Sequence, residues 1–316
     1  MTVRLIATGG TIASLADPET GAVRPAVSAE DLVATVPGLG PVAVEPVAHV
    51  NGWNVTPETM LEVARRAAQG GPVVVTHGTD TIEETAFLCD VTVENDVVFA
   101  GAMRNGSEIS ADGPRNLLCA SQVAQEAAGL GTLLVLNDEV HAARWARKQD
   151  SARVHALRSP GHGPVGIAVP GSVTITMPPP RRFLVPLPDA LPPVPVVQTY
   201  TGIEEHLIET VLDATGAAGL VLEGTGLGNV PGSAERGVAA AIERGLPVVS
   251  ATRVPAGGVH AVYGGPGGVV TLRDLGAIGA GTLSAAKARL LLMLLLAEGG
   301  DVRGRFEHAV ETLAGW

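Results

Sequence analysis

The stretch VVVTHGTDTIEETAFL, residues 73–88, decides the fold of this chain. It begins with the β-branched run of a buried strand, turns through HGTDT, and continues with the residue spacing of a helix. A wholly apolar strand that leads into a helix is typical of a parallel sheet with helices on both faces. Thr79 and Asp80 stand at the end of the strand, where open parallel sheets bind their ligands.

The same alternation of strand and helix extends along all 316 residues. We predict strands at 3–8, 73–77, 97–101, 131–137, 194–200, 219–224 and 246–252. We predict helices at 28–36, 56–70, 81–93, 113–129, 204–216, 233–245 and 289–300. The expected fold is therefore α/β, with a larger N-terminal domain built on a doubly wound parallel sheet.

A proline-dense segment separates two halves of the chain. It reads MPPPRRFLVPLPDALPPVPVV from residue 177 onward. Proline cannot continue a helix or a central strand, so we predict a linker at 178–193. Residues 1–177 would form the catalytic domain and residues 194–316 a smaller C-terminal α/β domain, in keeping with a length that exceeds one ordinary core.

The composition excludes several function classes. The formal net charge of −11 provides no basic field for a nucleic acid. The most apolar run, 289–300, is too short to cross a membrane, and the N-terminus reads as a first strand rather than a signal peptide. Cys89 and Cys119 lie in apolar helical contexts and favour two buried thiols, and no cluster has zinc-ligand spacing. We therefore expect a cytoplasmic protein.

Two turns at strand ends share one plan. ATGGTIAS places Thr11 after two glycines, and THGTDT places Thr79 after one. Glycine allows a ligand to approach the main chain closely, and free N–H groups are expected where a helix begins. A hydroxyl beside fixed N–H donors suits acyl transfer, because the hydroxyl attacks a carbonyl and the donors stabilise the oxyanion.

A threonine hydroxyl needs a proton acceptor, and lysine is scarce in this chain. Lys148 follows the predicted strand at 131–137, and in a dry pocket beside Asp80 its neutral form could accept a proton. Each signal also has an ordinary structural interpretation. A threonine after Gly-Gly is more often a helix N-cap, an aspartate at a helix start complements the dipole, and a lysine near arginines is usually a surface residue.

The combination of motifs resembles one family. IATGGTIAS at 6–14 and VVVTHGTDTIEETAF at 73–87 resemble the two signature motifs of bacterial-type L-asparaginases. The segments at 101–120, 137–151, 219–231 and 248–258 are similar to later parts of the same family, so the resemblance covers nearly the whole chain. It implies an amidohydrolase that converts L-asparagine to L-aspartate and ammonia.

The resemblance also implies roles for individual residues. Thr11 would be the nucleophile, Thr79 and Lys148 would handle protons, and Asp80 would hold the α-amino group of the substrate. The implied substrate-binding residues are Gly52, Trp53, Gly78, Ala102 and Asn229. Asn229 would reach in from a neighbouring subunit of a homodimer or homotetramer, and no metal or organic cofactor is implied.

Three positions depart from the family pattern. The loop at 14–27 has no tyrosine, since the chain has only Tyr200 and Tyr263. Gly52 and Trp53 stand where the family usually has a serine and a polar residue. The segment 254–268 lacks the acidic residue that the family often donates to the partner subunit.

These departures leave other functions open. A sister activity would act on L-glutamine, D-asparagine or a peptide amide; glutaminyl-tRNA is disfavoured by the negative charge. A non-catalytic ligand-binding protein could keep the fold. A nucleotide-binding oxidoreductase is the remaining alternative, because ATGGTIA follows a strand and Asp31 lies at the distance expected for a ribose contact, but the spacing is not G-x-G-x-x-G.

Overall fold

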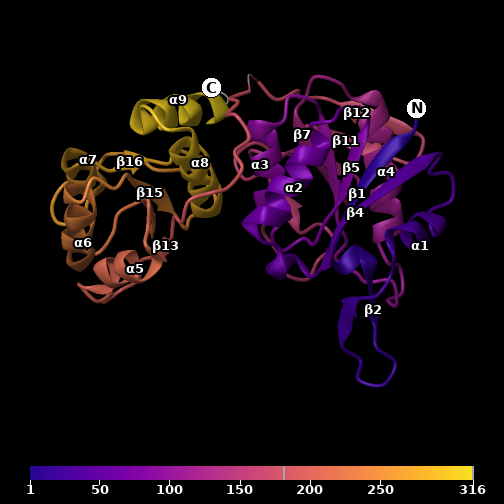
Figure 1. The fold of residues 1–316 in the computed structure, drawn as a ribbon, viewed down its shortest axis with the longest axis horizontal. Helices are drawn as coiled ribbons and strands as arrows, with labels where there is room; N and C mark the ends of the chain where they lie inside the picture. Colours follow the sequence, from indigo (N-terminus) through magenta and orange to yellow (C-terminus); the bar gives the residue numbers. More distant parts are fainter. Residues whose placement is uncertain (181, 315–316) are drawn as a thin grey trace. The chain divides into compact units, whose positions relative to one another are not determined.

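The computed structural model describes residues 1–180 and 182–314, and the chain divides into two compact units, Met1–Leu187 and Pro188–Trp316 (Figure 1). The division falls within the proline-rich range 178–193. Both units combine helices with a sheet, which confirms the predicted α/β fold class. No helix among the described residues is long and apolar enough to cross a membrane.

The first unit contains most of the strands. They are β1 (Val3–Gly9), β2 (Ser14–Ala16), β3 (Val23–Pro25), β4 (Val42–Val50), β5 (Val73–Thr76), β6 (Val97–Ala100), β7 (Thr132–Leu136), β8 (Glu139–Ala142), β9 (Arg147–Lys148), β10 (Leu157–Arg158), β11 (Gly166–Val169) and β12 (Ser172–Ile175). Its helices are η1 (Thr11–Ala13), α1 (Ala29–Ala34), η2 (Gly52–Asn54), α2 (Pro57–Ala67), α3 (Ile82–Thr92) and α4 (Gly113–Glu126), where η denotes a 3-10 helix.

The central sheet of this unit has eight strands in the order β12-β11-β8-β7-β6-β5-β1-β4. The five strands from β7 to β4 run parallel, whereas β8, β11 and β12 extend the sheet through antiparallel pairs. The sheet is therefore mixed rather than wholly parallel. The carboxyl ends of β1, β5, β6 and β7 meet at one edge, as parallel pairing requires, and this edge carries the candidate site.

Helices cover both faces of this sheet (Figure 1). Helices α1 and α4 contribute Leu32, Leu117 and Val123 to one core, where these side chains pack with β1, β5, β6 and β7. Helices α2 and α3 lie on the other face. All four residues of β5 and all four of β6 are buried, as expected for strands covered on both sides.

The second unit has a smaller sheet in the order β13-β14-β15-β16, with every pair parallel. Its elements are β13 (Val196–Gln198), α5 (Leu207–Thr215), β14 (Leu220–Gly224), α6 (Gly232–Glu243), β15 (Val248–Thr252), α7 (Val269–Leu275), β16 (Ile278–Gly279), α8 (Ala285–Glu298) and α9 (Val302–Ala314). Helix α8 is buried on nearly every side, because its sequence is apolar on nearly every side.

Several strands lie outside the predicted set. Strand β4 contains Pro46, which argues against a strand in sequence-based reasoning, but β4 is the edge strand and tolerates the missing N–H. Strands β7 and β8 form a hairpin through Asn137 and Asp138, whose φ angles of 51° and 67° suit a two-residue turn. The hairpin turns the chain back, and the sheet continues in antiparallel pairs from that point.

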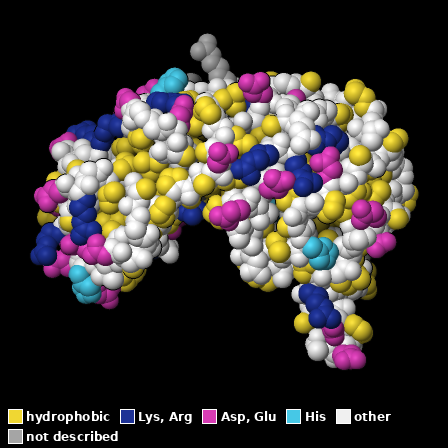
Figure 2. Space-filling view, viewed as in Figure 1, with side chains coloured by type: hydrophobic (Ala, Val, Ile, Leu, Met, Phe, Trp, Pro, Cys, Tyr) yellow, Lys and Arg dark blue, Asp and Glu magenta, His cyan; other side chains and the backbone are white. Residues whose placement is uncertain are grey.

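A second hairpin, β2–β3, projects from the first unit (Figures 1 and 2). It corresponds to the loop expected at 14–27. At its tip the Asp17 carboxylate accepts hydrogen bonds from the N–H groups of Glu19 and Thr20 and from Arg24. At the last residue of β2, next to this tip, Ala16 N–H donates to the Ser107 hydroxyl at 3.0 Å.

Candidate active site

The turn after β1 is built from main-chain contacts. Gly9 and Gly10 have φ angles of 102° and 82°, a region that disfavours other residues. A Cβ at Gly10 would lie 2.4 Å from Gly78 Cα, so the main chains of these two glycines touch. Thr11 follows as the first residue of η1, is half-buried, and is not the N-cap, since Gly10 takes that position. No hydrogen bond of its hydroxyl occurs within 1–180 and 182–314.

The turn after β5 carries Thr79 and Asp80. Helix α3 begins two residues later, with Thr81 as the N-cap residue, so neither Thr79 nor Asp80 is the cap. The Thr81 hydroxyl donates to the carbonyl of Gly52 at 2.6 Å. Because a Cβ at Gly78 would lie 2.6 Å from Gly52 Cα, three chain segments meet here at Gly10, Gly52 and Gly78.

Lys148 joins this turn from a distant part of the sequence. Its Nζ donates to Thr79 Oγ1 at 2.9 Å and to Asp80 Oδ1 at 2.7 Å. The Lys148 side chain is 18% exposed and the Asp80 side chain 43% exposed. The Thr79 hydroxyl in turn donates to Met103 Sδ at 3.4 Å. Lys148 therefore contacts both of the other side chains of the predicted Thr79–Asp80–Lys148 group.

A polar pocket opens beside this group. Its volume is 620 Å³, and its lining residues are Asp80, Glu83, Lys148, Gln149, Asp150 and Ser151. It differs from the dry cavity that we expected, because charged and amide side chains at the start of α3 and after β9 form its walls. The Asp80 side chain is accessible from this pocket and offers carboxylate oxygens to the donor groups of a ligand.

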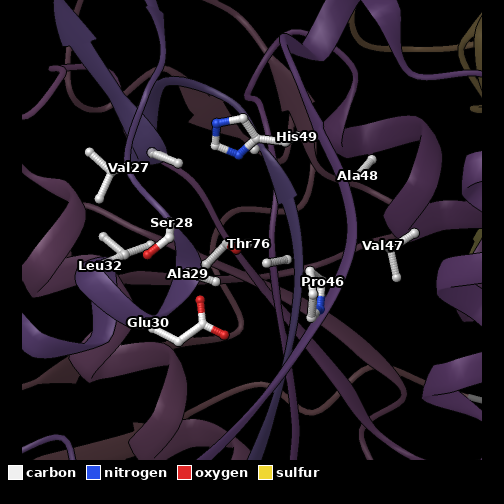
Figure 3. Close-up of a pocket in the computed structure, with 13 residues that line it drawn as sticks. Val27, Ser28, Ala29, Glu30, Leu32, Pro46, Val47, Ala48, His49 and Thr76 are labelled. Carbon is white, nitrogen blue, oxygen red and sulfur yellow. The ribbon is translucent and has the colours of Figure 1, made fainter.

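A second, largely apolar pocket of 260 Å³ lies behind the first turn, where β1 and β4 meet α1 (Figure 3). Thr76 and Pro46 are among its lining residues, and Ser28, Glu30 and His49 supply its polar groups. Ser28 is also the N-cap of α1, where its side chain accepts a hydrogen bond from Asp31 N–H. Asp31 therefore stands in the first turn of a helix, and its carboxylate is bonded to the Ser28 hydroxyl.

His77 is fully buried behind Thr79 and Asp80. Its Nδ1 lies 2.9 Å from the carbonyl oxygen of Gly78, and its Nε2 lies 2.9 Å from the Thr85 hydroxyl. Since a carbonyl only accepts, Nδ1 carries the proton and Nε2 accepts from Thr85. Burial lowers the pKa of His77 to about 4, an effect that the bond to Gly78 opposes. His77 is therefore neutral at pH 7 and ties the turn to α3.

The end of β6 supports the same site. A Cβ at Gly101 would lie 2.8 Å from Thr79 Cγ2, so this glycine leaves space for Thr79. The Asp112 carboxylate accepts from the N–H groups of Met103 and Arg104 and fixes the chain after Ala102. Ala102 is wholly buried, and its substrate-binding role stays a prediction.

The remaining predicted residues lie in different settings. Gly52 is buried, whereas the Trp53 side chain is 65% exposed on η2. Asn229 belongs to the second unit, where its side-chain oxygen accepts from Val269 N–H at 3.2 Å. Tyr200 and Tyr263 also belong to the second unit. The substrate-binding roles of Trp53 and Asn229 stay predictions.

Sequence reasoning assigned no role to three supporting residues: His77, Met103 and Glu83. His77 and Glu83 stand inside the motif at 73–87, but their partners are set by tertiary contacts that the motif does not reveal. Within 1–180 and 182–314, no group of three or more histidine, cysteine or carboxylate side chains is arranged to hold a metal ion. Cys89 and Cys119 are buried free thiols.

Comparison with known proteins gives matches along most of the chain. Residues 2–181 match the family model "Asparaginase, N-terminal", and residues 193–305 match "Glutaminase/Asparaginase C-terminal domain". A probable L-asparaginase of Deinococcus radiodurans is 38% identical, over 97% of each chain. L-asparaginase 2 of Bacillus subtilis is 35% identical, over 95% of this chain and 83% of the relative.

A solved structure is similar throughout. The crystal structure of a probable cytoplasmic L-asparaginase from Campylobacter jejuni matches with a TM-score of 0.89 and 31% sequence identity. The match covers 98% of this chain and 99% of the other. Both units of the fold are therefore shared with that protein.

Proposed function

The chain belongs to the bacterial-type asparaginase family, and from this premise we propose that it hydrolyses the side-chain amide of L-asparagine to L-aspartate and ammonia. The observation that carries the proposal is the position of Lys148 Nζ, which lies 2.9 Å from Thr79 Oγ1 and 2.7 Å from Asp80 Oδ1. A primary amine in contact with both a hydroxyl and a carboxylate is suited to moving protons during acyl transfer.

In the proposed reaction Thr11 is the nucleophile. Its hydroxyl oxygen attacks the amide carbon, its proton passes to the leaving nitrogen, and ammonia departs. When the C–N bond breaks, the acyl group remains bonded to Thr11 as an ester. Water then hydrolyses this ester to release aspartate and restore the Thr11 hydroxyl. The support is that Gly10, directly before Thr11, packs against Gly78, directly before Thr79, so the two turns adjoin.

Thr79 and Lys148 serve the proton transfers, and Asp80 binds the substrate's ammonium group. In the free protein Asp80 is bonded to Lys148. Once a substrate ammonium shares that carboxylate, Asp80 is divided between two cations, which favours transfer of a proton away from Lys148. Gly52, Gly78 and Ala102 offer main-chain groups, while Trp53 forms part of the rim.

The first test is a screen for ammonia release with L-asparagine, D-asparagine, L-glutamine and small peptide amides. We expect L-asparagine to be the preferred substrate and Thr11→Ala to lower kcat by about 10⁴-fold, as for loss of a nucleophile. Thr215→Ala is the matched control. Thr215 lies at an exposed position at the end of α5 in the second unit, and the variant should keep wild-type kcat. Ammonia release from only one of the other amides would identify that amide as the substrate in place of L-asparagine. Ammonia release from none of them would favour a ligand-binding protein.

We also propose that the active form is a homodimer or homotetramer in which Asn229 completes the site of a neighbouring subunit, and that the protein acts in the cytoplasm. The supports are the family assignment and the two buried free thiols, which suit a reducing compartment. Unchanged specific activity in a preparation shown to be monomeric by light scattering would contradict the subunit arrangement.

A further inference from the structure

Two carboxylates on helix α3 face the chain segment that carries Lys148. Glu83 lies in its first turn and Asp90 seven residues later. Two helical turns span 7.2 residues, so both side chains leave the helix on the same side. Each of them accepts a hydrogen bond from the short segment between Arg144 and Lys148.

The Lys148 end of that segment has little secondary structure of its own. Strand β9 contains only Arg147 and Lys148, and it pairs with the equally short β10. The main-chain N–H of Lys148 does not point to a strand partner but donates to Glu83 Oε2 at 2.5 Å. A hydrogen bond to an ionised carboxylate is among the stronger ones in proteins.

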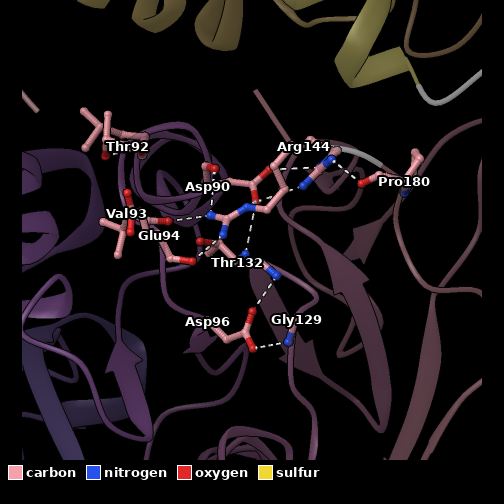
Figure 4. A network of polar contacts seen from close by, with 12 residues as sticks. Asp90, Thr92, Val93, Glu94, Asp96, Gly129, Thr132, Arg144 and Pro180 are labelled. Atoms are coloured by element: carbon pink, nitrogen blue, oxygen red, sulfur yellow. Dashed lines mark hydrogen bonds and ion pairs between the residues drawn. The ribbon is translucent and has the colours of Figure 1, made fainter. Parts of the chain in front are cut away.

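The Arg144 end is held separately. Arg144 Nε and Nη2 donate to the two oxygens of Asp90 at 2.9 and 3.2 Å, and both side chains are at most 1% exposed (Figure 4). Asp90 also accepts from Thr132 N–H at 3.0 Å. This buried ion pair keeps α3 and the Arg144 segment together, so a change at Glu83 releases only the Lys148 end.

We propose that Glu83 is a positioning residue for Lys148, an inference that rests on the proposed function. Its carboxylate holds the main chain of Lys148, so that Nζ arrives between Thr79 and Asp80 rather than in the open pocket that Glu83 also lines. Glu83 acts through an accepting oxygen, because its partner is a neutral N–H group. An amide oxygen at the same place can accept the same bond.

The test compares substitutions at Glu83 by steady-state kinetics on the amide that the wild type prefers. Glu83→Ala removes the acceptor and should lower kcat about 10- to 100-fold, with KM changed less than about threefold, since misplacing a proton-transfer group affects turnover. Glu83→Gln restores an acceptor and should recover at least about a third of the wild-type kcat. Glu62→Ala, a helical carboxylate on α2 that pairs with Arg66, is the matched control.

Two results would overturn the inference. Wild-type kcat in Glu83→Ala would show that Lys148 needs no such anchor. A Glu83→Gln variant as impaired as Glu83→Ala, or a loss that lies mainly in KM, would assign Glu83 to charge or substrate contact instead. If Glu83→Ala does not fold, Glu83→Leu takes its place: its side chain fills similar space without an accepting oxygen, and wild-type kcat there would equally refute the anchor.

The failure of this inference is distinguishable from that of the proposed function. An inactive wild type, or a fully active Lys148→Met variant, would refute the proposed function. An active wild type, an inactive Lys148→Met variant and a wild-type-like Glu83→Ala variant would refute only the role of Glu83.

Discussion

The two threonine-bearing turns of the first unit are held in place by different means. The turn before Thr11 depends on glycines whose main chains touch neighbouring main chains. The turn before Thr79 shares the contact between Gly78 and Gly10 and is held in addition by side chains: a neutral buried histidine, a lysine and a carboxylate. The first support is steric and does not depend on pH, whereas the second is polar and ionisable.

This difference suggests a division of labour. A nucleophile needs an exact position more than a tuned charge, and close main-chain packing provides position. A proton-transfer group needs partners that can exchange protons and charges, and side chains provide these. Substitutions should therefore act through clashes at the first turn and through lost charge or hydrogen bonds at the second.

The largest effect on kcat is expected at the turn before Thr79, which Lys148 contacts. Lys148→Met should lower kcat about 10³-fold or more, since loss of a general acid–base group typically removes 10²- to 10⁴-fold. The thermal midpoint should move little, because Asp80 is 43% exposed and water can replace its partner. Ammonia release and a melting curve measure the two quantities.

Lys148→Arg sharpens this prediction. Arginine keeps the positive charge but does not give up its proton near neutral pH, so the variant should be nearly as inactive as Lys148→Met. If Lys148→Arg keeps most of the wild-type kcat, the amine contributes charge rather than proton transfer.

The next largest effect is expected at the turn before Thr11, where glycine main chains touch. Gly10→Ala places a Cβ 2.4 Å from Gly78 Cα, at a φ of 82°, so the main chain of one turn must shift. We expect a loss of about 3 kcal/mol in the free energy of unfolding, together with a large loss of kcat. Urea unfolding and ammonia release provide the measurements.

Gly21→Ala is the matched control. Gly21 has a φ of 72°, but nothing lies within 4 Å of the added Cβ, so only the backbone penalty of about 1–2 kcal/mol applies. Equal losses in Gly10→Ala and Gly21→Ala would mean that the contact between Gly10 and Gly78 contributes nothing.

The smallest effect concerns pH. The pKa of His77 is about 4 in the folded protein, below its ordinary value of 6.5, because burial disfavours the charged form. Between these values the unfolded chain binds a proton that the folded protein does not, so stability falls as the pH decreases. From pH 7.5 to pH 5 the loss should be about 2 kcal/mol from His77.

His141 contributes in the same direction, since burial also lowers its pKa, against the opposing effect of Glu139. Urea unfolding of His77→Gln at both pH values isolates the share of His77. An identical pH dependence in the wild type and in His77→Gln would contradict the prediction.

Much of the fold could be predicted because local signals agreed with the tertiary structure. The buried runs of β5 and β6 and the helix patterns of α2, α3 and α4 each lie inside a predicted range. Edge and antiparallel strands were missed, since Pro46 and partial exposure hide β4 and the turn at Asn137 and Asp138 precedes strands without a long apolar run.

The site was predicted unevenly, for a physical reason. Thr79 and Asp80 are revealed by a strand-to-helix motif, but their contact with Lys148, 69 and 68 residues away, depends on how distant segments pack. Local sequence does not show that Glu83 accepts from the main chain of Lys148 or that Thr85 orients His77. The loop at 14–27 became a hairpin because Asp17 gathers donors across its tip.

The proline in strand β4 has a consequence for assembly. An outermost strand normally presents a row of free donors and acceptors on which another chain can form a further strand. Pro46 has no N–H to offer, so the row is interrupted midway along β4. Open-ended growth by strand addition is thereby disfavoured at this border of the sheet.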